Sequence, residues 1–109
     1  MEQQVEAYLT SLRKDPYSPT SEHPLDTELL AVLIDGGKVV KVNDSVVFTA
    51  EAYKEMSDKI IAHLKSEGSI TVADARTMFD SSRKFLLPLL EYLDQQQITR
   101  RVGDERVLR

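Results

Sequence analysis

The carboxyl-terminal stretch of residues 81–109 changes its residue pattern abruptly, and this change constrains the fold more than any other feature of the chain. Apolar residues first recur at the spacing of an α-helix that starts at the first or second residue of the stretch. From Ile98 onward the pattern is typical of a strand, and Gly103 with Asp104 predicts a two-residue turn into a return strand. The stretch therefore predicts a helix followed at once by a β-hairpin.

A two-residue turn also fixes the register of this hairpin, and it places Arg101 directly opposite Arg106. Like charges in opposed positions of a sheet destabilise it. We therefore expect a polyanion to lie across the pair, and we expect an Arg106→Val change to stabilise the free protein slightly. The alternative is that Asp104, Glu105 or solvent screens the two charges.

The charges of the chain are distributed unevenly along its length. Residues 1–75 hold 7 Lys and Arg against 13 Asp and Glu, a net charge of −6, whereas residues 76–109 hold 7 against 5, a net charge of +2. Six of the seven arginines lie in the second range. Arginine suits bidentate contacts with phosphates and bases, so the distribution predicts a surface for an anionic partner near the carboxyl end.

The length and composition limit the classes of protein that are possible. With 109 residues, 41% of them hydrophobic, the chain is long enough for one ordinary domain or two small modules. It has no cysteine, so neither a disulfide framework nor a thiolate metal site is available. It has no run of about 18 apolar residues, and its first residues are polar and acidic, unlike a signal peptide. We expect a soluble, cytoplasmic protein that binds no membrane.

Two helices and a hairpin are predicted in the first half of the chain. Apolar residues have helical spacing over 2–14 and over 26–35. The Pro-containing stretch 15–24 between them cannot continue a helix. Two runs of β-branched residues flank Asn43 and Asp44, which predicts a hairpin with its turn at these two residues.

The second half predicts one more helix before its hairpin. A long helix is expected over 50–66 and a short strand over 69–71. Thr71 and Asp74 have the spacing of a capping box, which opens a helix that runs to Phe79. The predicted order is therefore helix, short strand, helix, helix and hairpin.

The two halves match each other when the chain is shifted by 60 residues. In the first copy Lys41 is predicted opposite Val46, where the second copy has the two arginines. The matched residues are Leu29 with Leu89, Leu30 with Leu90, Leu33 with Leu93, Lys41 with Arg101, Val42 with Val102, Asp44 with Asp104 and Val47 with Val107.

A three-helix bundle with a β-hairpin wing is the winged-helix architecture, in which the last helix and the wing commonly contact nucleic acid. We therefore predict an α+β, mostly helical fold with two tandem winged-helix modules, at residues 1–50 and 51–109. The first module is shortened and has no strong binding surface, whereas the second is adapted to bind.

Pro88 lies inside the last predicted helix, where it removes the hydrogen bond to the carbonyl group of Lys84. A kinked helix that begins before Arg83 is one interpretation. The other is a helix that begins near Pro88, which would leave Arg83 and Lys84 in a loop. We favour the first interpretation.

The stretch from about 68 to 108 resembles the last winged-helix module of the bacterial selenocysteine-specific translation elongation factor. The motifs that carry the resemblance are Ser82-Arg83-Lys84, Leu89 to Asp94, and Thr99 to Asp104. One departure is Gln95 to Gln97, where the family's helix usually stops at a glycine; a left-handed glutamine there is one way to end the helix.

The resemblance implies a protein that binds the mRNA hairpin directing selenocysteine insertion at UGA. It also implies a carboxyl-terminal fragment that is associated with the ribosome in the full-length parent, whose GTPase lies in other domains. We expect no cofactor, no catalysis and a monomer. The residues expected to bind RNA are Arg76, Ser82, Arg83, Lys84, Arg100, Arg101 and Arg106.

Two other functions remain open on the residues alone, because a fold does not fix a function. The first is duplex-DNA binding by a transcriptional regulator, although the cations of the last helix are confined to its first turn. The second is protein interaction by a winged helix. Phe85 is a weak candidate for base stacking, and Glu91 and Asp94 are expected to pair with nearby arginines. His23 and His63 are isolated, so a metal site is not expected.

Overall fold

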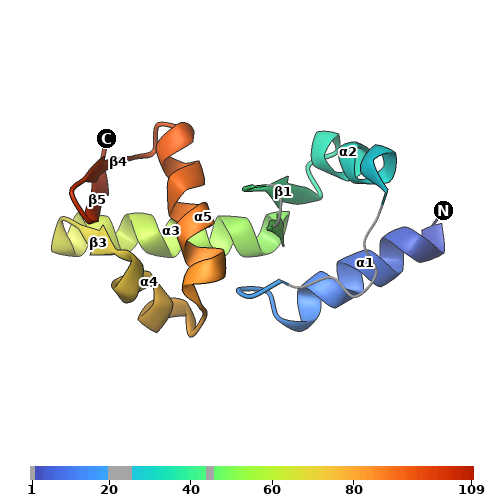
Figure 1. Ribbon diagram of the computed structural model, residues 1–109, viewed down its shortest axis with the longest axis horizontal. Helices are drawn as coiled ribbons and strands as arrows, with labels where there is room; N and C mark the ends of the chain where they lie inside the picture. The colour runs from blue at the N-terminus through green and yellow to red at the C-terminus, as the bar shows by residue number, and fades with distance from the viewer. Residues whose placement is uncertain (1, 20–25, 44–45) are drawn as a thin grey trace.

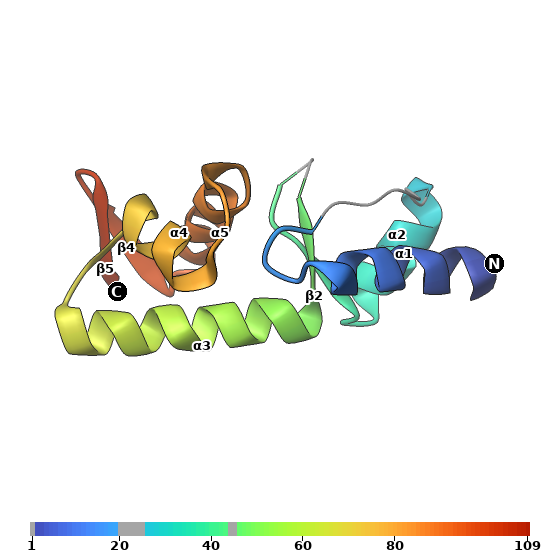
Figure 2. The same cartoon turned by 90° about the horizontal axis from the view of Figure 1, so that it is seen from below.

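The computed structural model describes residues 2–19, 26–43 and 46–109. The molecule is elongated, with extents of 44 × 24 × 19 Å. Its longest helix, α3 (Ala50–Glu67), lies along the second half of the chain and joins it to the first half (Figures 1 and 2). Within the described ranges no helix is both long and apolar enough to cross a membrane.

The first half contains two helices and one hairpin, as predicted. Its elements are α1 (Glu2–Lys14), α2 (Thr27–Asp35), β1 (Val39–Lys41) and β2 (Val47–Thr49). The side chain of Asp26 caps α2 by accepting a hydrogen bond from the backbone N–H of Leu29. The end of the predicted Pro-containing stretch, residues 20–24, lies outside the described residues.

The register of the first hairpin differs from the prediction by one residue. Lys41 lies opposite Val47, so the predicted pairing with Val46 is wrong. The reason is the turn, in which the side chain of Asn43 accepts a hydrogen bond of 2.7 Å from the backbone N–H of Val46. Asparagine side chains commonly accept such hydrogen bonds from backbone N–H groups at turns. The predicted turn residue Asp44 is not among the described residues.

The second half has the predicted order of elements. After α3 come β3 (Ile70–Thr71), α4 (Val72–Phe79), α5 (Arg83–Gln95), β4 (Thr99–Val102) and β5 (Glu105–Leu108). The strands form an antiparallel sheet in the order β3-β5-β4. Gly68 ends α3 in the left-handed conformation, and Thr71 with Asp74 makes the predicted capping box of α4. This is the winged-helix arrangement expected for residues 51–109.

Helix α5 begins at Arg83, with Ser82 as its N-cap, and continues through Pro88. Arg83 and Lys84 therefore lie in the helix, as the favoured interpretation expected, although the helix begins one or two residues later than predicted; the kink at Pro88 stays a prediction. The helix ends near the run of glutamines. Gln97 has a φ of 63°, the left-handed conformation that a glycine would adopt more easily.

The core consists of two groups of buried residues, and the boundary between them does not fall at residue 50. The first group joins α1 and α2 to β1. The second fills the space between α3, α4 and α5, and it also includes Val42, Val46 and Phe48 of the first hairpin. Phe48 is completely buried. The division into modules 1–50 and 51–109 stays a prediction, because packing continues across it.

Candidate nucleic-acid interface

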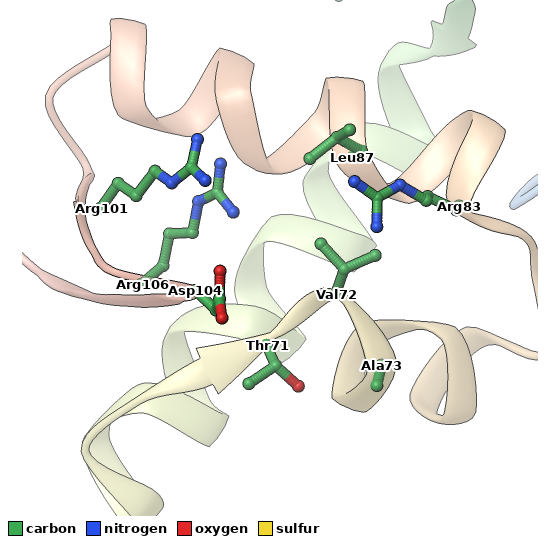
Figure 3. A pocket seen from close by; sticks show the side chains of 8 residues that line it. All are labelled: Thr71, Val72, Ala73, Arg83, Leu87, Arg101, Asp104 and Arg106. Atoms are coloured by element: carbon green, nitrogen blue, oxygen red, sulfur yellow. The ribbon is translucent and has the colours of Figure 1, made fainter.

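The β4–β5 hairpin, hereafter the wing, forms a cavity of about 330 Å³ with the starts of α4 and α5. Figure 3 shows the basic side chains entering this space from two sides, with Arg83 on α5 and two arginines on the wing. The lining residues are Thr71, Val72, Ala73, Arg83, Leu87, Arg101, Asp104 and Arg106.

Local structure explains why these residues meet. The capping box fixes Thr71 at the point where β3 becomes α4. Arg83 is the first residue of α5, and Leu87 lies one turn further along the same face. The wing turn at Gly103, whose φ is 63°, brings β5 back between β4 and β3. Three elements that are separate in the sequence therefore share one cavity.

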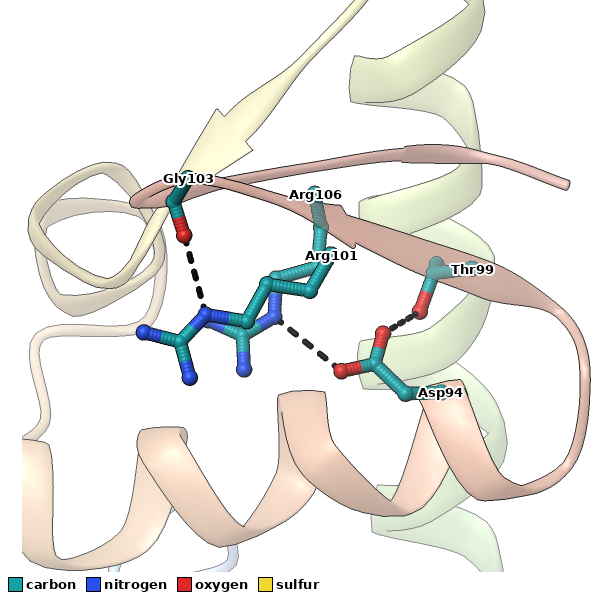
Figure 4. Close-up of polar contacts among 5 residues, drawn as sticks. All are labelled: Asp94, Thr99, Arg101, Gly103 and Arg106. Carbon is teal, nitrogen blue, oxygen red and sulfur yellow. Dashed lines mark hydrogen bonds and ion pairs between the residues drawn. The ribbon is translucent and has the colours of Figure 1, made fainter.

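The structure confirms that Arg101 lies opposite Arg106 in the wing. The two guanidinium groups lie beside each other in both close-up views (Figures 3 and 4). Their environments differ, however, because Arg101 is exposed whereas Arg106 is only 2% exposed. Arg101 donates a hydrogen bond of 2.9 Å from Nε to the carbonyl oxygen of Gly103.

Asp94 on α5 provides the negative charge next to the buried arginine. Its Oδ2 accepts a hydrogen bond from Arg106 Nε at 3.3 Å, and its Oδ1 accepts one from the hydroxyl of Thr99 at 2.6 Å (Figure 4). Neither screening by solvent nor screening by the turn carboxylates describes Arg106, because the balancing charge comes from the helix. Cross-strand repulsion therefore no longer predicts that Arg106→Val stabilises the free protein.

One donor of this network has no acceptor. Among the described residues, none accepts a hydrogen bond from Nη2 of Arg106, although this atom is buried. Leaving a buried donor unpaired costs about 1–3 kcal/mol. The side chain of Arg106 lines the cavity and lies beside that of the exposed Arg101.

The start of α5 presents two further cations. Arg83 and Lys84 are both exposed, and Nζ of Lys84 lies 5.4 Å from the ring centre of Phe85. A helix amino terminus favours anions through its free N–H groups and its dipole. Ser82 occupies the N-cap position, but its hydroxyl makes no capping hydrogen bond. Phe85 is 6% exposed and belongs to the core, so it is not available for base stacking.

Arg76 and Arg100 are exposed but are not among the described residues that line the cavity. Arg100 is paired with Val107 and follows the opposite face of the wing from Arg101, because side chains alternate along a strand. Residues of the described chain form no cluster of three His, Asp or Glu that could hold a metal.

Some of the site was not foreseen from the sequence. The pairing of Asp94 with a nearby arginine was predicted and is confirmed. The contribution of Thr71, Val72 and Leu87 was missed. The capping box located the start of α4, but nothing in the sequence indicated that this start faces the wing.

Comparisons with known families and known proteins both find similarity to selenocysteine-specific elongation factors. Residues 62–108 match a family described as "Elongation factor SelB, winged helix". A selenocysteine-specific elongation factor from Desulfomicrobium baculatum is 30% identical over 82 residues. The match covers 75% of this chain but only 13% of that relative, so the chain spans a small part of the relative's length.

Two solved structures share the fold. One is the mRNA-binding domain of elongation factor SelB from E. coli in complex with SECIS RNA, with a TM-score of 0.76 and 19% identity, covering 99% of this chain and 98% of that one. The other is a bacterial selenocysteine-specific elongation factor, EF-Sec, with a TM-score of 0.67 and 26% identity, covering 81% of this chain and 14% of that one. These matches confirm the mostly helical winged-helix fold.

Proposed function

We propose that this chain, whose residues 62–108 match the winged helix of the elongation factor SelB family, binds the SECIS hairpin, the mRNA structure that directs selenocysteine insertion at UGA. The observation that carries the proposal is the meeting of Arg83 with Arg101 and Arg106 at one cavity. Asp94 balances Arg106, so Arg83 and Arg101 remain against the single carboxylate of Asp104, and this net positive charge favours an anion.

The unpaired donor of Arg106 supports a phosphate group as the anion. A phosphate oxygen would supply the acceptor that Nη2 lacks, and the exposed side chain of Arg101 lies beside that of Arg106 (Figure 3). We propose that Arg101 shifts toward solvent when a phosphate enters. Arg106 would then bind the phosphate from its buried position in the wing, whereas Arg83, Lys84 and Arg101 would bind it from the surface.

The shape of the basic surface favours an RNA hairpin over a DNA duplex. The cations lie at the start of α5 and on the wing, whereas Glu91 is exposed further along the helix. A helix that entered a DNA major groove would need polar or basic side chains along its length. RNA hairpins are instead bound through the backbone and through unstacked loop or bulge bases. We propose that Ser82, Arg76 and Arg100 contribute contacts at the edge of this surface.

The remaining parts of the proposal concern the whole protein. We propose that this chain has no catalytic activity of its own, that it acts as a monomer in the cytoplasm, and that it is part of a longer factor. In that factor it would hold a GTPase near the ribosome, as the similarity to selenocysteine-specific elongation factors suggests.

A competition binding assay tests the proposed function. The labelled SECIS hairpin is bound to the chain and challenged with the same unlabelled hairpin, a hairpin of scrambled loop and bulge, and a DNA duplex of equal length. We expect only the unlabelled SECIS hairpin to compete efficiently at physiological salt. Equal competition by the duplex would instead indicate a DNA-binding protein, and absence of binding to the labelled SECIS hairpin would overturn the proposed function.

A further inference from the structure

The segment after α1, residues 15–19, lies against the second half of the molecule. The ring of Tyr17 packs edge-on against Phe79 at the end of α4, with ring centres 5.1 Å apart and planes at 60°. The Nζ atom of Lys59 on α3 lies 5.7 Å from the Tyr17 ring centre. One residue of the first half thus contacts both α3 and α4.

Hydrogen bonds add polar contacts to this packing. The hydroxyl of Tyr17 donates to Oε1 of Glu55, and this bond raises the pKa of Tyr17 above its ordinary value. The segment is itself folded into a turn, in which the backbone N–H of Ser18 donates to the carbonyl oxygen of Asp15 at 3.1 Å.

The same segment holds the short connection between α4 and α5. Oγ of Ser81 donates a hydrogen bond of 2.8 Å to the carbonyl oxygen of Tyr17, and the hydroxyls of Ser18 and Ser81 are also hydrogen-bonded to each other. Ser81 lies two residues before Arg83, the first residue of α5. The contacts therefore end close to the first basic residue of the proposed interface.

Helix α5 needs such support because its own cap is incomplete. Ser82 is at the N-cap, yet its hydroxyl makes no capping hydrogen bond, whereas α3 and α4 are capped by the side chains of Thr49 and Thr71. The connection also contains Asp80 in the left-handed conformation, with a φ of 47°. An uncapped helix start frays easily, and fraying would move the side chains of the first turn.

We propose that residues 15–19 are a brace that fixes the first turn of α5, so that the first half of the chain takes part in RNA binding without touching the RNA. Tyr17, Ser18 and Ser81 are positioning residues for Arg83 and Lys84. This inference rests on the proposed function. It assigns a role to the half of the chain from which no described residue lines the basic cavity.

The brace is tested in the full chain by combining Tyr17→Ala with Arg83→Ala. We expect Tyr17→Ala to weaken binding of the SECIS hairpin about tenfold, the loss of roughly one well-placed contact. Arg83→Ala should then cost much less in the Tyr17→Ala background than in the unaltered chain, because an unfixed Arg83 contributes little. Equal losses in both backgrounds would overturn the proposal.

Matched variants separate the brace from a general loss of packing. Tyr53→Ala removes another half-buried tyrosine, which packs edge-on against Tyr92 at the far end of α5, and it should leave the Arg83→Ala loss unchanged. Tyr17→Phe keeps the ring and its backbone carbonyl, so it should bind nearly as well as the unaltered chain. Ser81→Ala removes the hydrogen bonds but no ring, and it provides the test if Tyr17→Ala fails to fold.

Backbone ¹⁵N relaxation of the free chain tests, without RNA, whether the brace reduces the motion of the first turn of α5. The order parameters of residues 82–84 should be near 0.85 in the unaltered chain and should fall toward about 0.6 in Tyr17→Ala or Ser81→Ala. Unchanged values would overturn the brace even if RNA binds. Failure of the unaltered chain to bind the hairpin would overturn the proposed function, while the relaxation data would still decide whether the brace exists.

Discussion

Two arginines that lie opposite each other in the wing, Arg101 and Arg106, have different surroundings. Residue order predicted their pairing, because the turn at Gly103 fixes the register. It did not predict that Arg106 is buried while Arg101 is exposed, because both share one face and the difference depends on β5 lying between β3 and β4, with β4 at the edge of the sheet. The ion pair with Asp94 stabilises the charge of Arg106 in its buried position.

Removal of Asp94 should leave the buried charge of Arg106 without its partner. We expect Asp94→Ala to lower the free energy of unfolding by about 3 kcal/mol, as for other ion pairs broken on one side. Asp58→Ala is a matched control, because Asp58 pairs with Lys54 while both side chains are largely exposed. Its cost should stay below about 1 kcal/mol. Urea denaturation of both variants measures the difference, and similar costs would mean that the Asp94 pair contributes no more than a surface pair.

Arg101 should affect RNA binding more than stability. It is exposed, and its side chain donates a hydrogen bond to the nearby backbone carbonyl of Gly103. Arg101→Ala should make the slope of log affinity against log salt shallower by about 0.7–0.9, as expected for one lost phosphate contact. Arg13→Ala, an exposed arginine at the end of α1, should leave the slope unchanged. Titrations at three salt concentrations check this, and an unchanged slope for Arg101→Ala would remove this residue from the phosphate contacts.

At the scale of single elements, the residues that begin and end helices were the most informative part of the sequence. Gly68 and the capping box of Thr71 and Asp74 fixed the boundaries of α3 and α4 because their chemistry is local. The first hairpin was predicted one residue out of register, since the side-chain closure by Asn43 does not follow from the pattern of its strands. The residues at the ends of these helices therefore predicted the helix boundaries, whereas the strand pattern did not predict the register of the first hairpin.

The end of α5 offers a test of backbone strain. Gln97 holds a φ of 63°, which costs a residue with a Cβ atom about 1 kcal/mol relative to glycine. We expect Gln97→Gly to raise the free energy of unfolding by up to about 1 kcal/mol. Gln96→Gly should instead lower the free energy of unfolding. At a φ of −80° glycine relieves no strain in the folded protein, while it increases the conformational entropy of the unfolded chain. Thermal melts of the two variants should shift in opposite directions, and a shared direction would contradict the strain argument.

At the scale of the whole molecule, the contacts between the two halves were invisible in the sequence. The helical and strand periods identified each half, and the shift of 60 residues showed their likeness. The burial of Phe48 in the core of the second half and the packing of Tyr17 on Phe79 join residues distant in the chain. Such contacts have no period, so only the three-dimensional structure reveals them.

Truncation of Phe48 should therefore destabilise the second half, although this residue precedes it in the chain. We expect Phe48→Ala to cost about 3–5 kcal/mol and to lower hydrogen-exchange protection in α3 and α5. Leu12→Ala, in the separate core group of α1 and α2, should lower protection mainly in the first half. Protection losses confined to the first half in both variants would show that the halves fold independently.

Helix α3 begins at Ala50, immediately after β2 ends at Thr49, and this direct junction has a geometric consequence. With 18 residues the helix is about 27 Å long, at about 1.5 Å per residue. A tilt of about 10° at its first turn would displace its last turn by about 5 Å. Such a tilt would have to break the packing of Phe48 and of Tyr17 on the second half, so these two contacts keep β3 and the wing in a fixed position relative to α1 and α2.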